Sequence, residues 1–551
     1  MGISCSGCDQ IEDQKACAKG KRFVRKGIQR KTRIYDFISL LAVLWFVLIV
    51  IGNHRVLLVD DAYIFERYAR NLIQHGELVF NVGERVEGIT SLLWMFLFAI
   101  NIAILKIKFE NYVAILSVTI LLIFTIRVWW ICNRFKNPWL SFPIVLILFS
   151  NKFFLISSTN GLEGVLYNYL IFEMLYAFWE NKIDCSFILS SIIFLIRPEG
   201  LIFGLLMVLF LILSSEKIKI KHIGIVFFIL VVFGISVFRL VYYQQLIPNS
   251  IISKSIPITF VMEHGLSSIK NYLVGFLNSW IFFVFVFFYS VGYLFSEAFK
   301  PLWSSKNIPS AVLVDQIRDK IFNDNNNRVL FLAAIIIVFS VIVVVRNGGD
   351  WMPGYRLLSQ YSSVYVFILI VLLNKNILET KILYSYGAVI AVIILFGFSR
   401  LQPGLPIITY GSDYYSAIAR RLKKDLQKDD WVCAEAIGYI GHLLPDQSIL
   451  DPLGLVQKHI SRYGYPQISY GKMDIPYILQ EAKPTVIIWH WGGHLKGYED
   501  LVEKEYVVYC GSDCFTLNAD LVLIRKDAIG RFQDEFHDWV IIDNATKLFS
   551  K

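Results

Sequence analysis

Long apolar segments separated by short polar stretches run from residue 34 to residue 400 of this 551-residue chain. A helix needs about 20 mainly apolar residues to cross the hydrocarbon core of a bilayer. Twelve segments are candidates for such helices: 34–52, 91–107, 112–132, 138–156, 162–180, 183–197, 200–215, 222–244, 271–296, 328–346, 358–374 and 382–400. The pattern therefore predicts a polytopic α-helical membrane protein.

Basic residues predict the orientation of these helices. Nine Lys or Arg residues lie between Lys15 and Arg33, immediately before the first apolar segment. Loops rich in Lys and Arg stay in the cytoplasm, so the tail 1–33 is expected on that side. Later basic linkers then place the loop 53–90 and everything after residue 400 outside.

A cytoplasmic N-terminus and an external C-terminus require an odd number of crossings. One of the candidates must therefore be a surface or re-entrant segment, and we expect it to be 138–156, which Pro143, Asn151 and Lys152 interrupt. The sequence thus predicts about eleven transmembrane helices in a domain covering 34–400.

The character of the chain changes after Arg400. Residues 401–551 have ordinary polarity, with an expected amphipathic helix over 413–428. Four strand-like runs follow: WVCAEAIGYIG, PTVIIWHW, EYVVYC and LVLIR. Alternating helices and apolar strands predict a small α/β domain, here on the external face. Cys510 and Cys514 lie in this domain, and whether they form a disulfide in that oxidising compartment stays open.

Composition excludes other classes of protein. The chain is 56% hydrophobic with a mean hydropathy of +0.55. This is more apolar surface than one or two globular cores can bury, so a soluble fold is excluded. The net charge of +9 comes mostly from the N-terminal tail. We therefore expect membrane lipids, and no nucleic acid, as partners.

The polar stretch from Asp60 to Thr90 is the strongest candidate for a functional site. It begins with two adjacent carboxylates where the chain leaves the first apolar segment. Asp60 or Asp61 could cap a helix that runs to about Gln74 and stops at Gly76. We expect one carboxylate to face a reaction cavity as a general base and the other to hold the helix or a cation. The alternative is a pair with only a capping role.

Further charges interrupt apolar segments at the expected external face: Glu163, Arg197, Glu199, Arg239, Lys254, Asp350 and Arg356. Each would cost about 2.5 to 3.5 kcal/mol in a bilayer unless it pairs, reaches the interface or lines a wet cavity. Their common location predicts a shared cavity. Arg and Lys suit a phosphate group, whereas carboxylates suit proton removal and contacts with sugar hydroxyls. Glycines 348 and 349 would let backbone amides approach an anion.

These blocks resemble those of a known family. DDAYIFERYARNLIQHGELVFNVGERVEGITSLLW is similar to the first external loop of bacterial GT-C glycosyltransferases related to the mycobacterial terminal arabinofuranosyltransferase. NGLEG, LIRPEG, YYQQLIPNSIISK and GGDWMPGYR resemble later blocks of this family in the same order, as do AIGYIG and DPLGLVQKHI in its external domain. The resemblance covers residues from about 55 to 525.

The resemblance implies an inverting transfer of a sugar from a polyprenyl-phosphate donor on the outer face of a bacterial cytoplasmic membrane. The acceptor would be a cell-envelope glycan, a lipid or a protein. The catalytic aspartate of the family maps to the acidic pair, with Asp60 expected as the base and Asp61 as the alternative. Donor phosphate contacts are expected from Arg197, Lys254 and Arg356. The sugar or acceptor site is expected to be lined by Glu163, Glu199 and Asp350.

Three questions stay open. The chain is rich in Ile, Phe, Lys and Asn and poor in Ala and Pro, unlike typical actinobacterial members, so the sugar could be arabinofuranose, another pentose or a hexose. A divalent cation at the acidic pair is an option, although one loop supplies few ligands. A transporter or flippase of lipid-linked glycans is the rival class. It would be expected to show internal repeats and a site at the membrane midplane, and the sequence shows neither.

Overall fold

The structure is a computed structural model that describes residues 34–52, 56–134, 138–214, 223–304, 310–375 apart from 351 and 353, 408–409, 412–468, 471–489, 492–512, 514 and 520–542. The basic tail 1–33 and the candidate helix 382–400 lie outside the described residues. Contacts group the chain into two units. Unit 1 comprises Met1–Asn53, Leu121–Ser150 and Leu373–Pro403, and unit 2 comprises His54–Ile120, Asn151–Leu372 and Gly404–Lys551. Every site discussed below lies within unit 2.

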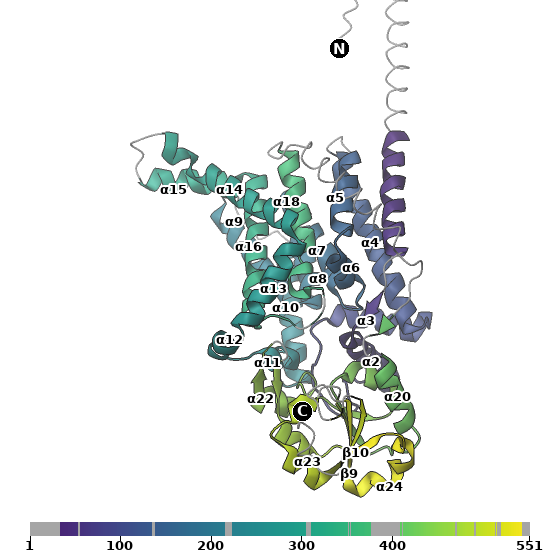
Figure 1. Cartoon of the computed structure of the whole chain (residues 1–551). Coiled ribbons are helices and arrows are strands. Elements are labelled where there is room, and N and C mark those ends of the chain that lie inside the picture. Colours follow the sequence, from purple (N-terminus) through teal and green to yellow (C-terminus); the bar gives the residue numbers. More distant parts are fainter. Residues whose placement is uncertain are drawn as a thin grey trace, which may run out of the picture. The chain divides into compact units, whose positions relative to one another are not determined.

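Most of the chain before residue 375 is helical (Figure 1). A first helix covers Ile34–Gly52. The next helices are α2 (Asp60–His75), α3 (Leu92–Ile100), α4 (Phe109–Arg134), α5 (Ser141–Phe149), α6 (Lys152–Thr159), α7 (Gly164–Trp179), α8 (Ile183–Ile196), α9 (Glu199–Leu213) and α10 (Ile223–Tyr242). After these come α11 (Asn249–Lys254), α12 (Ile258–His264), α13 (Leu266–Ser279), α14 (Ile281–Ser304), α15 (Ser310–Arg318), α16 (Asn325–Arg346), α17 (Arg356–Ser359) and α18 (Ser362–Asn374).

Six of these helices, within the described residues, are long and apolar enough to cross a membrane: Ile34–Gly52, Phe109–Arg134, Ile223–Tyr242, Ile281–Lys300, Asn325–Arg346 and Arg356–Asn374. The number becomes seven if α5 and α6 count as one span. Three more apolar helices are shorter: Leu92–Leu105, Ile183–Ile196 and Glu199–Leu213. At 1.5 Å per residue these three are shorter than a bilayer core of about 30 Å. The structure is that of a chain with several membrane-type helices, and it does not establish the predicted count of about eleven.

Two predicted segments are each broken into two helices. The segment 138–156 divides at Asn151, whose side chain accepts hydrogen bonds from the amides of Phe153 and Phe154 and so caps α6. The predicted interruption at Asn151 and Lys152 is confirmed, whereas the one predicted at Pro143 is wrong, because Pro143 lies inside α5. The segment 271–296 was predicted as one helix, which is wrong, because α13 ends and α14 begins around Trp280.

The C-terminal domain contains a six-stranded mixed sheet in the order β10-β8-β9-β7-β3-β4. Its strands are β3 (Trp431–Ala434), β4 (Ser448–Leu450), β7 (Val486–Trp489), β8 (Tyr506–Ser512), β9 (Asp520–Arg525) and β10 (Val540–Ile542). Strand β3 runs parallel to β4 and β7, and the other pairs are antiparallel. Short ladders pair β1 (Leu57–Leu58) with β2 (Ile408–Thr409) and β5 (Tyr465–Gln467) with β6 (Gly471–Met473).

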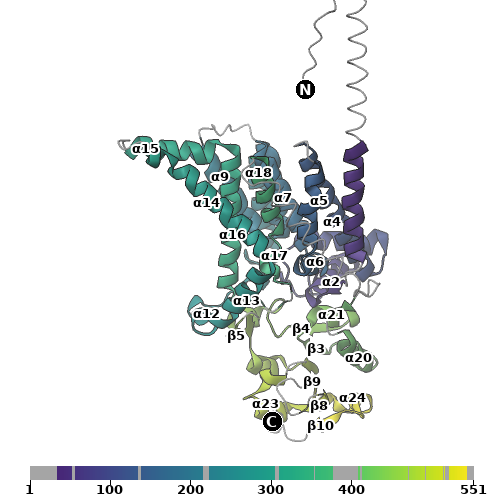
Figure 2. The same cartoon turned by 45° about the horizontal axis from the view of Figure 1, so that its top comes forward.

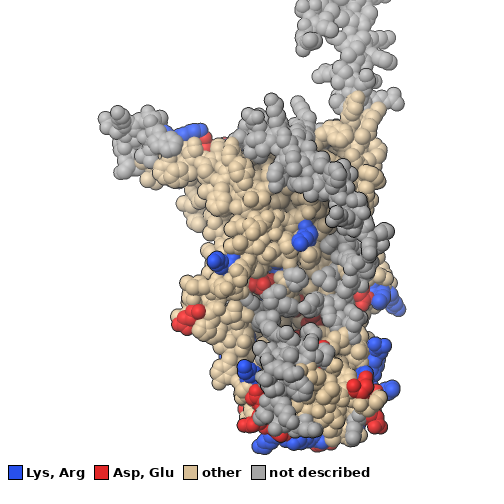
Figure 3. Space-filling view, viewed as in Figure 1, with Lys and Arg blue, Asp and Glu red and all other residues tan. Residues whose placement is uncertain are grey.

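Helices accompany this sheet: α20 (Ser412–Leu422), α21 (Ile437–Leu443), α22 (Lys458–Tyr463), α23 (Glu499–Glu505) and α24 (Ile529–Phe532). The domain core packs Ile487, Leu521 and Leu523 of the sheet with Leu479 and Val502. On the face in Figure 3, charged side chains gather over this domain, whereas the helical part around α14 and α16 is mostly uncharged. The predicted C-terminal domain with helices and strands is therefore present.

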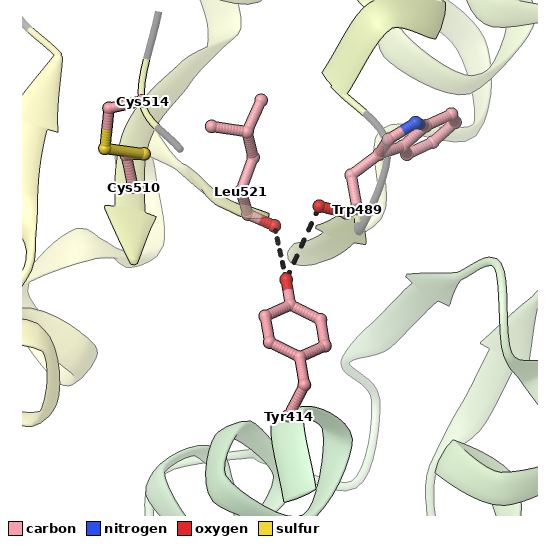
Figure 4. The surroundings of a disulfide bond; sticks show 5 residues. All are labelled: Tyr414, Trp489, Cys510, Cys514 and Leu521. Carbon is pink, nitrogen blue, oxygen red and sulfur yellow. Dashed lines mark hydrogen bonds between the residues drawn. A yellow bond between two sulfur atoms is a disulfide. The ribbon is translucent and has the colours of Figure 1, made fainter. Parts of the chain in front are cut away.

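Two elements of the C-terminal domain differ from the prediction. The run WVCAEAIGYIG was expected to be a strand, but only Trp431–Ala434 is extended and Ile437–Leu443 forms α21. The expected helix over 413–428 is present and ends earlier, at Leu422. The disulfide left open by the sequence is formed between Cys510 and Cys514 (Figure 4). In the same view, the hydroxyl of Tyr414 on α20 is 3.4 Å from the carbonyl oxygens of Trp489 and Leu521 and donates across the ends of β7 and β9.

Candidate active site

Helix α2 carries the two adjacent carboxylates in its first turn. The cap position is Val59, and no side chain caps the helix, so the prediction that Asp60 or Asp61 serves as N-cap is wrong. The predicted stop is confirmed: Gly76 adopts the left-handed conformation, with φ of 71°, and closes the helix. Because neither aspartate is used as a cap, both side chains are available for contacts outside the helix.

The polar stretch after α2 folds back onto this helix. The side-chain amide of Asn71 donates to the carbonyls of Val79 and Phe80, at 3.0 and 2.8 Å. The hydroxyl of Tyr68 donates to the carbonyl of Val86 and accepts from the amide of Gly88, both at 2.7 Å. Buried backbone groups that would otherwise lack partners are satisfied in this way, which gives the loop a fixed path.

A cavity of about 660 Å³ in unit 2 brings the predicted charges together. Of the eight predicted site residues, the following line it: Asp61, Glu163, Arg197, Glu199, Lys254, Asp350 and Arg356. They come from α2, the segment before α7, the junction of α8 and α9, α11, and the segment around α17. The eighth residue, Asp60, is not among the lining residues.

Arg356 lies between two carboxylates of this cavity. Its Nε donates to Oδ2 of Asp350 at 2.8 Å and its Nη1 to Oδ2 of Asp61 at 3.2 Å. The side chain of Asp350 is 4% exposed, whereas that of Asp61 is 20% exposed. Arg356 thus holds Asp61 by one oxygen at the cavity and leaves the other carboxylate oxygen for a further partner.

Arg197 has the same arrangement in another part of the lining. Its Nη1 donates to Glu163 at 2.8 Å, and its Nη2 donates to Oε1 of Glu199 at 3.2 Å. The second oxygen of Glu199 is buried and has no hydrogen-bond partner among the described residues. A buried acceptor without a partner is costly, so this oxygen is suited to a hydroxyl donor that enters the cavity.

Two further cations line the cavity without a carboxylate partner in the described part of the chain. Lys254, at the end of α11, is half-buried, and burial together with the positive charge of Arg356 lowers its pKa. Arg346, at the end of α16, is exposed and donates to the carbonyl of Ile256. The cavity therefore has two arginines already paired with carboxylates and two cations that form no ion pair within the described residues and can meet an anion.

Gly348 and Gly349 do not offer their amides to an anion. These amides donate to the carbonyls of Val345 and Val344, at 3.2 and 3.0 Å, and so end α16. Both residues have positive φ, 70° and 96°, which glycine adopts without strain. The glycines therefore serve to turn the chain toward Asp350, and the prediction of an amide anion site there is wrong.

Asp60 points to the C-terminal domain. Its Oδ1 accepts from the amide of Tyr439 at 2.7 Å and its Oδ2 from the amide of Gly438 at 3.2 Å, at the start of α21. Burial and the neighbouring charge of Asp61 raise the pKa of Asp60 to about 7, although these two hydrogen bonds act in the opposite direction. The sequence led us to expect one carboxylate, preferably Asp60, at a cavity and the other holding the helix or a cation. In the structure Asp61 lines the cavity, and Asp60 instead accepts from amides of α21.

The acidic pair does not fit a divalent cation well. Asp60 is committed to amides of α21, and Asp61 is paired with Arg356. Within the described residues, no group of three or more His, Cys, Asp or Glu side chains could hold a metal ion.

One charge that was predicted for the cavity lies elsewhere, and one residue that lines the cavity was not predicted. The side chain of Arg239 pairs with Glu87 at 3.0 Å, and neither residue lines the cavity. Arg346 does line it but was read as the end of an apolar helix. Its position immediately before NGGDWMPGYR is the signal that could have found it.

Comparison with known proteins gives one family match. Residues 407–537 match the model of a domain of unknown function, DUF8728. This region covers most of the C-terminal domain, including α21 and every strand of the six-stranded sheet except β10. No curated protein matches the chain.

Proposed function

We propose that this protein is an inverting glycosyltransferase of the outer face of the bacterial cytoplasmic membrane. It moves a sugar, arabinofuranose or another pentose or a hexose, from a polyprenyl-phosphate donor to a glycan, lipid or protein of the cell envelope. The observation that carries the proposal is that one cavity brings together Asp61, two carboxylate–arginine groups and two cations without a carboxylate partner in the described residues. The internal disulfide is typical of an oxidising compartment and supports an external C-terminal domain.

Asp61 is the base in this proposal. Its free oxygen takes the proton of an acceptor hydroxyl while the hydroxyl oxygen forms a bond to the anomeric carbon. The bond from that carbon to the phosphate oxygen breaks, and the electron pair leaves with the polyprenyl phosphate. Lys254 and Arg346 are placed to bind this phosphate and to stabilise its growing negative charge. Glu199 and Glu163 would accept hydrogen bonds from sugar hydroxyls.

Mass spectrometry of the lipids that co-purify with the protein tests this proposal. We expect a polyprenyl-phosphate sugar on the Asp61→Asn variant in larger amounts than on the wild type, because the variant binds donor but cannot use it. The Asp429→Asn variant, which makes the same chemical change at an exposed position, is the matched control and should behave as the wild type. Bulk phospholipid alone on both proteins, from membranes known to contain donor, would contradict the proposal. A glycan lipid on both that is never transferred would favour a flippase.

A further inference from the structure

Helix α21 of the C-terminal domain lies against α2 (Figure 2), and hydrogen bonds connect the two helices. At its start, the amides of Gly438 and Tyr439 donate to the carboxylate of Asp60. At its end, Nη1 of Arg67 donates to the carbonyl of Gly441 at 2.8 Å. Asp60 and Arg67 are seven positions apart, about two helical turns, so both side chains leave the same face of α2.

Glycine permits this close approach. A Cβ added at Gly438 would lie 2.2 Å from the carbonyl oxygen of Asp60 and 2.9 Å from the amide nitrogen of Ile64. A Cβ at Gly441 would lie 2.9 Å from Cδ of Arg67. The first contact is with backbone, which cannot move aside as a flexible side chain can. Gly438 therefore fixes the distance between α21 and the first turn of α2.

A third connection lies next to the second of these points. Nδ1 of His442 on α21 is 3.2 Å from Oε2 of Glu66 on α2. Burial alone would raise the pKa of Glu66, but the hydrogen bond with His442 and the charge of Arg70 lower it below its ordinary value. The α2–α21 contact is thus polar and specific, and it includes the turn that carries Asp61.

We propose that Asp60 is a positioning residue and that α21 sets the direction of Asp61. With both oxygens of Asp60 held by amides of α21 and its backbone against Gly438, the first turn of α2 is held in the orientation in which the side chain of Asp61 reaches the cavity. The C-terminal domain is then an integral part of the active site. This inference rests on the proposed function, in which Asp61 is the base.

The test separates the hydrogen-bonding role of Asp60 from a role in proton transfer. Purified full-length variants are assayed with total lipid extract and cell envelope of the producing cells as donor and acceptor, and polyprenyl phosphate is the binding probe. Asp60→Ala removes both acceptors, whereas Asp60→Asn keeps one oxygen for the amide of Tyr439. A misplacement of about 1 Å costs up to about a hundredfold in rate, so we expect Asp60→Ala to lower the rate at saturating donor at least tenfold. Asp60→Asn should recover most of that loss, and probe binding should stay at the wild-type level in both.

Gly438→Ala provides an independent test on the other helix. It should lower the rate at saturating donor by about tenfold or more, with little change in the amount of donor that half-saturates it. Gly530→Ala is the matched control, because a Cβ there meets nothing within 4 Å, and it should leave the rate unchanged.

The outcomes distinguish a failure of the positioning role of Asp60 from a failure of the proposed function. Equal losses in Asp60→Asn and Asp60→Ala would overturn the positioning role and make Asp60 the base. Wild-type rates in Asp60→Ala or in Gly438→Ala would also overturn it. A wild-type protein that transfers nothing and does not bind polyprenyl phosphate would instead overturn the proposed function.

Discussion

Asp61 and Arg356 are 295 positions apart in the chain, and their side chains form an ion pair of 3.2 Å at the cavity. Asp350 accepts from the other side of the same guanidinium at 2.8 Å. One planar group therefore fixes the relative positions of two carboxylates, one nearly buried and one facing the cavity. The direction of the proposed base depends on this group as well as on α21.

Replacing Arg356 tests that dependence. Arg356→Lys keeps the charge but lacks the planar fork that serves both carboxylates, so we expect the rate at saturating donor to fall by about ten- to a hundredfold with folding retained. Arg356→Ala leaves two carboxylates without their ion-pair partner and should also destabilise the protein by about 3 to 5 kcal/mol. Thermal unfolding and transfer rates measure these effects. Arg420→Lys, at an exposed position, is the control, and an unchanged rate in Arg356→Lys would refute the positioning of Asp61 by this arginine.

Lys254 and Arg346 should bind the phosphate of the donor. Loss of a hydrogen bond to a charged group costs about 1.5 to 3 kcal/mol, so Lys254→Gln and Arg346→Gln should each weaken binding of polyprenyl phosphate by about ten- to a hundredfold. Binding to detergent-solubilised protein measures this, with Lys428→Gln as the exposed control. Full affinity in both variants would return the phosphate role to Arg197 and Arg356, which the sequence had predicted for it.

The pH dependence of stability should reveal the titration of the Asp60 carboxyl group. Its pKa is raised from an ordinary value of 3.8 to about 7, so the folded protein holds this proton over a range in which the unfolded chain releases it. The resulting stabilisation is fully present below the unfolded pKa and is lost as pH rises through about 7. Asparagine does not titrate. The melting temperature of the wild type should therefore fall, relative to Asp60→Asn, between pH 5 and pH 8. Parallel curves for the two proteins would contradict the raised pKa.

Reduction of the Cys510–Cys514 disulfide should destabilise the C-terminal domain. The loop between the two cysteines is short, with a sequence separation of 4, so the entropy of loop closure gives about 2 kcal/mol. The Cys510→Ser, Cys514→Ser double variant should melt at a lower temperature than the oxidised wild type and should not respond to reductant. If the domain lies outside the cytoplasm, mass spectrometry of protein alkylated directly from cells should find neither cysteine alkylated, because both are in the disulfide. Free thiols in cells would contradict that location.

Features with a local cause were predictable. Gly76 ends α2 because a left-handed residue must close the helix, and glycine after the last apolar position indicates it. Strands β7, β8 and β9 follow from short apolar runs bounded by polar residues. The division at Asn151 follows from a side chain that caps the next helix.

Features that depend on distant partners were not predictable from the sequence. The run containing Ile437–Leu443 is apolar enough for a strand, and its helical form reflects packing against α2 through Gly438 and Gly441. The site was predicted as a set of charges, and seven of its members share one cavity. Their roles could not be predicted, because an arginine already paired with two carboxylates looks the same in sequence as one that is free.

The sequence by itself determined that apolar helices precede a C-terminal domain of helices and strands, and it predicted that several dispersed charges, Asp61 among them, share one site. These conclusions rest on the spacing of apolar residues and on the positions of charged residues within apolar segments, where charge is costly. Both are local properties of the chain. Only the tertiary structure decided that Asp61 faces the cavity and Asp60 faces α21, since the amide that Oδ2 of Asp60 accepts from lies 378 positions away. Two adjacent carboxylates are chemically equal until distant segments fold against them.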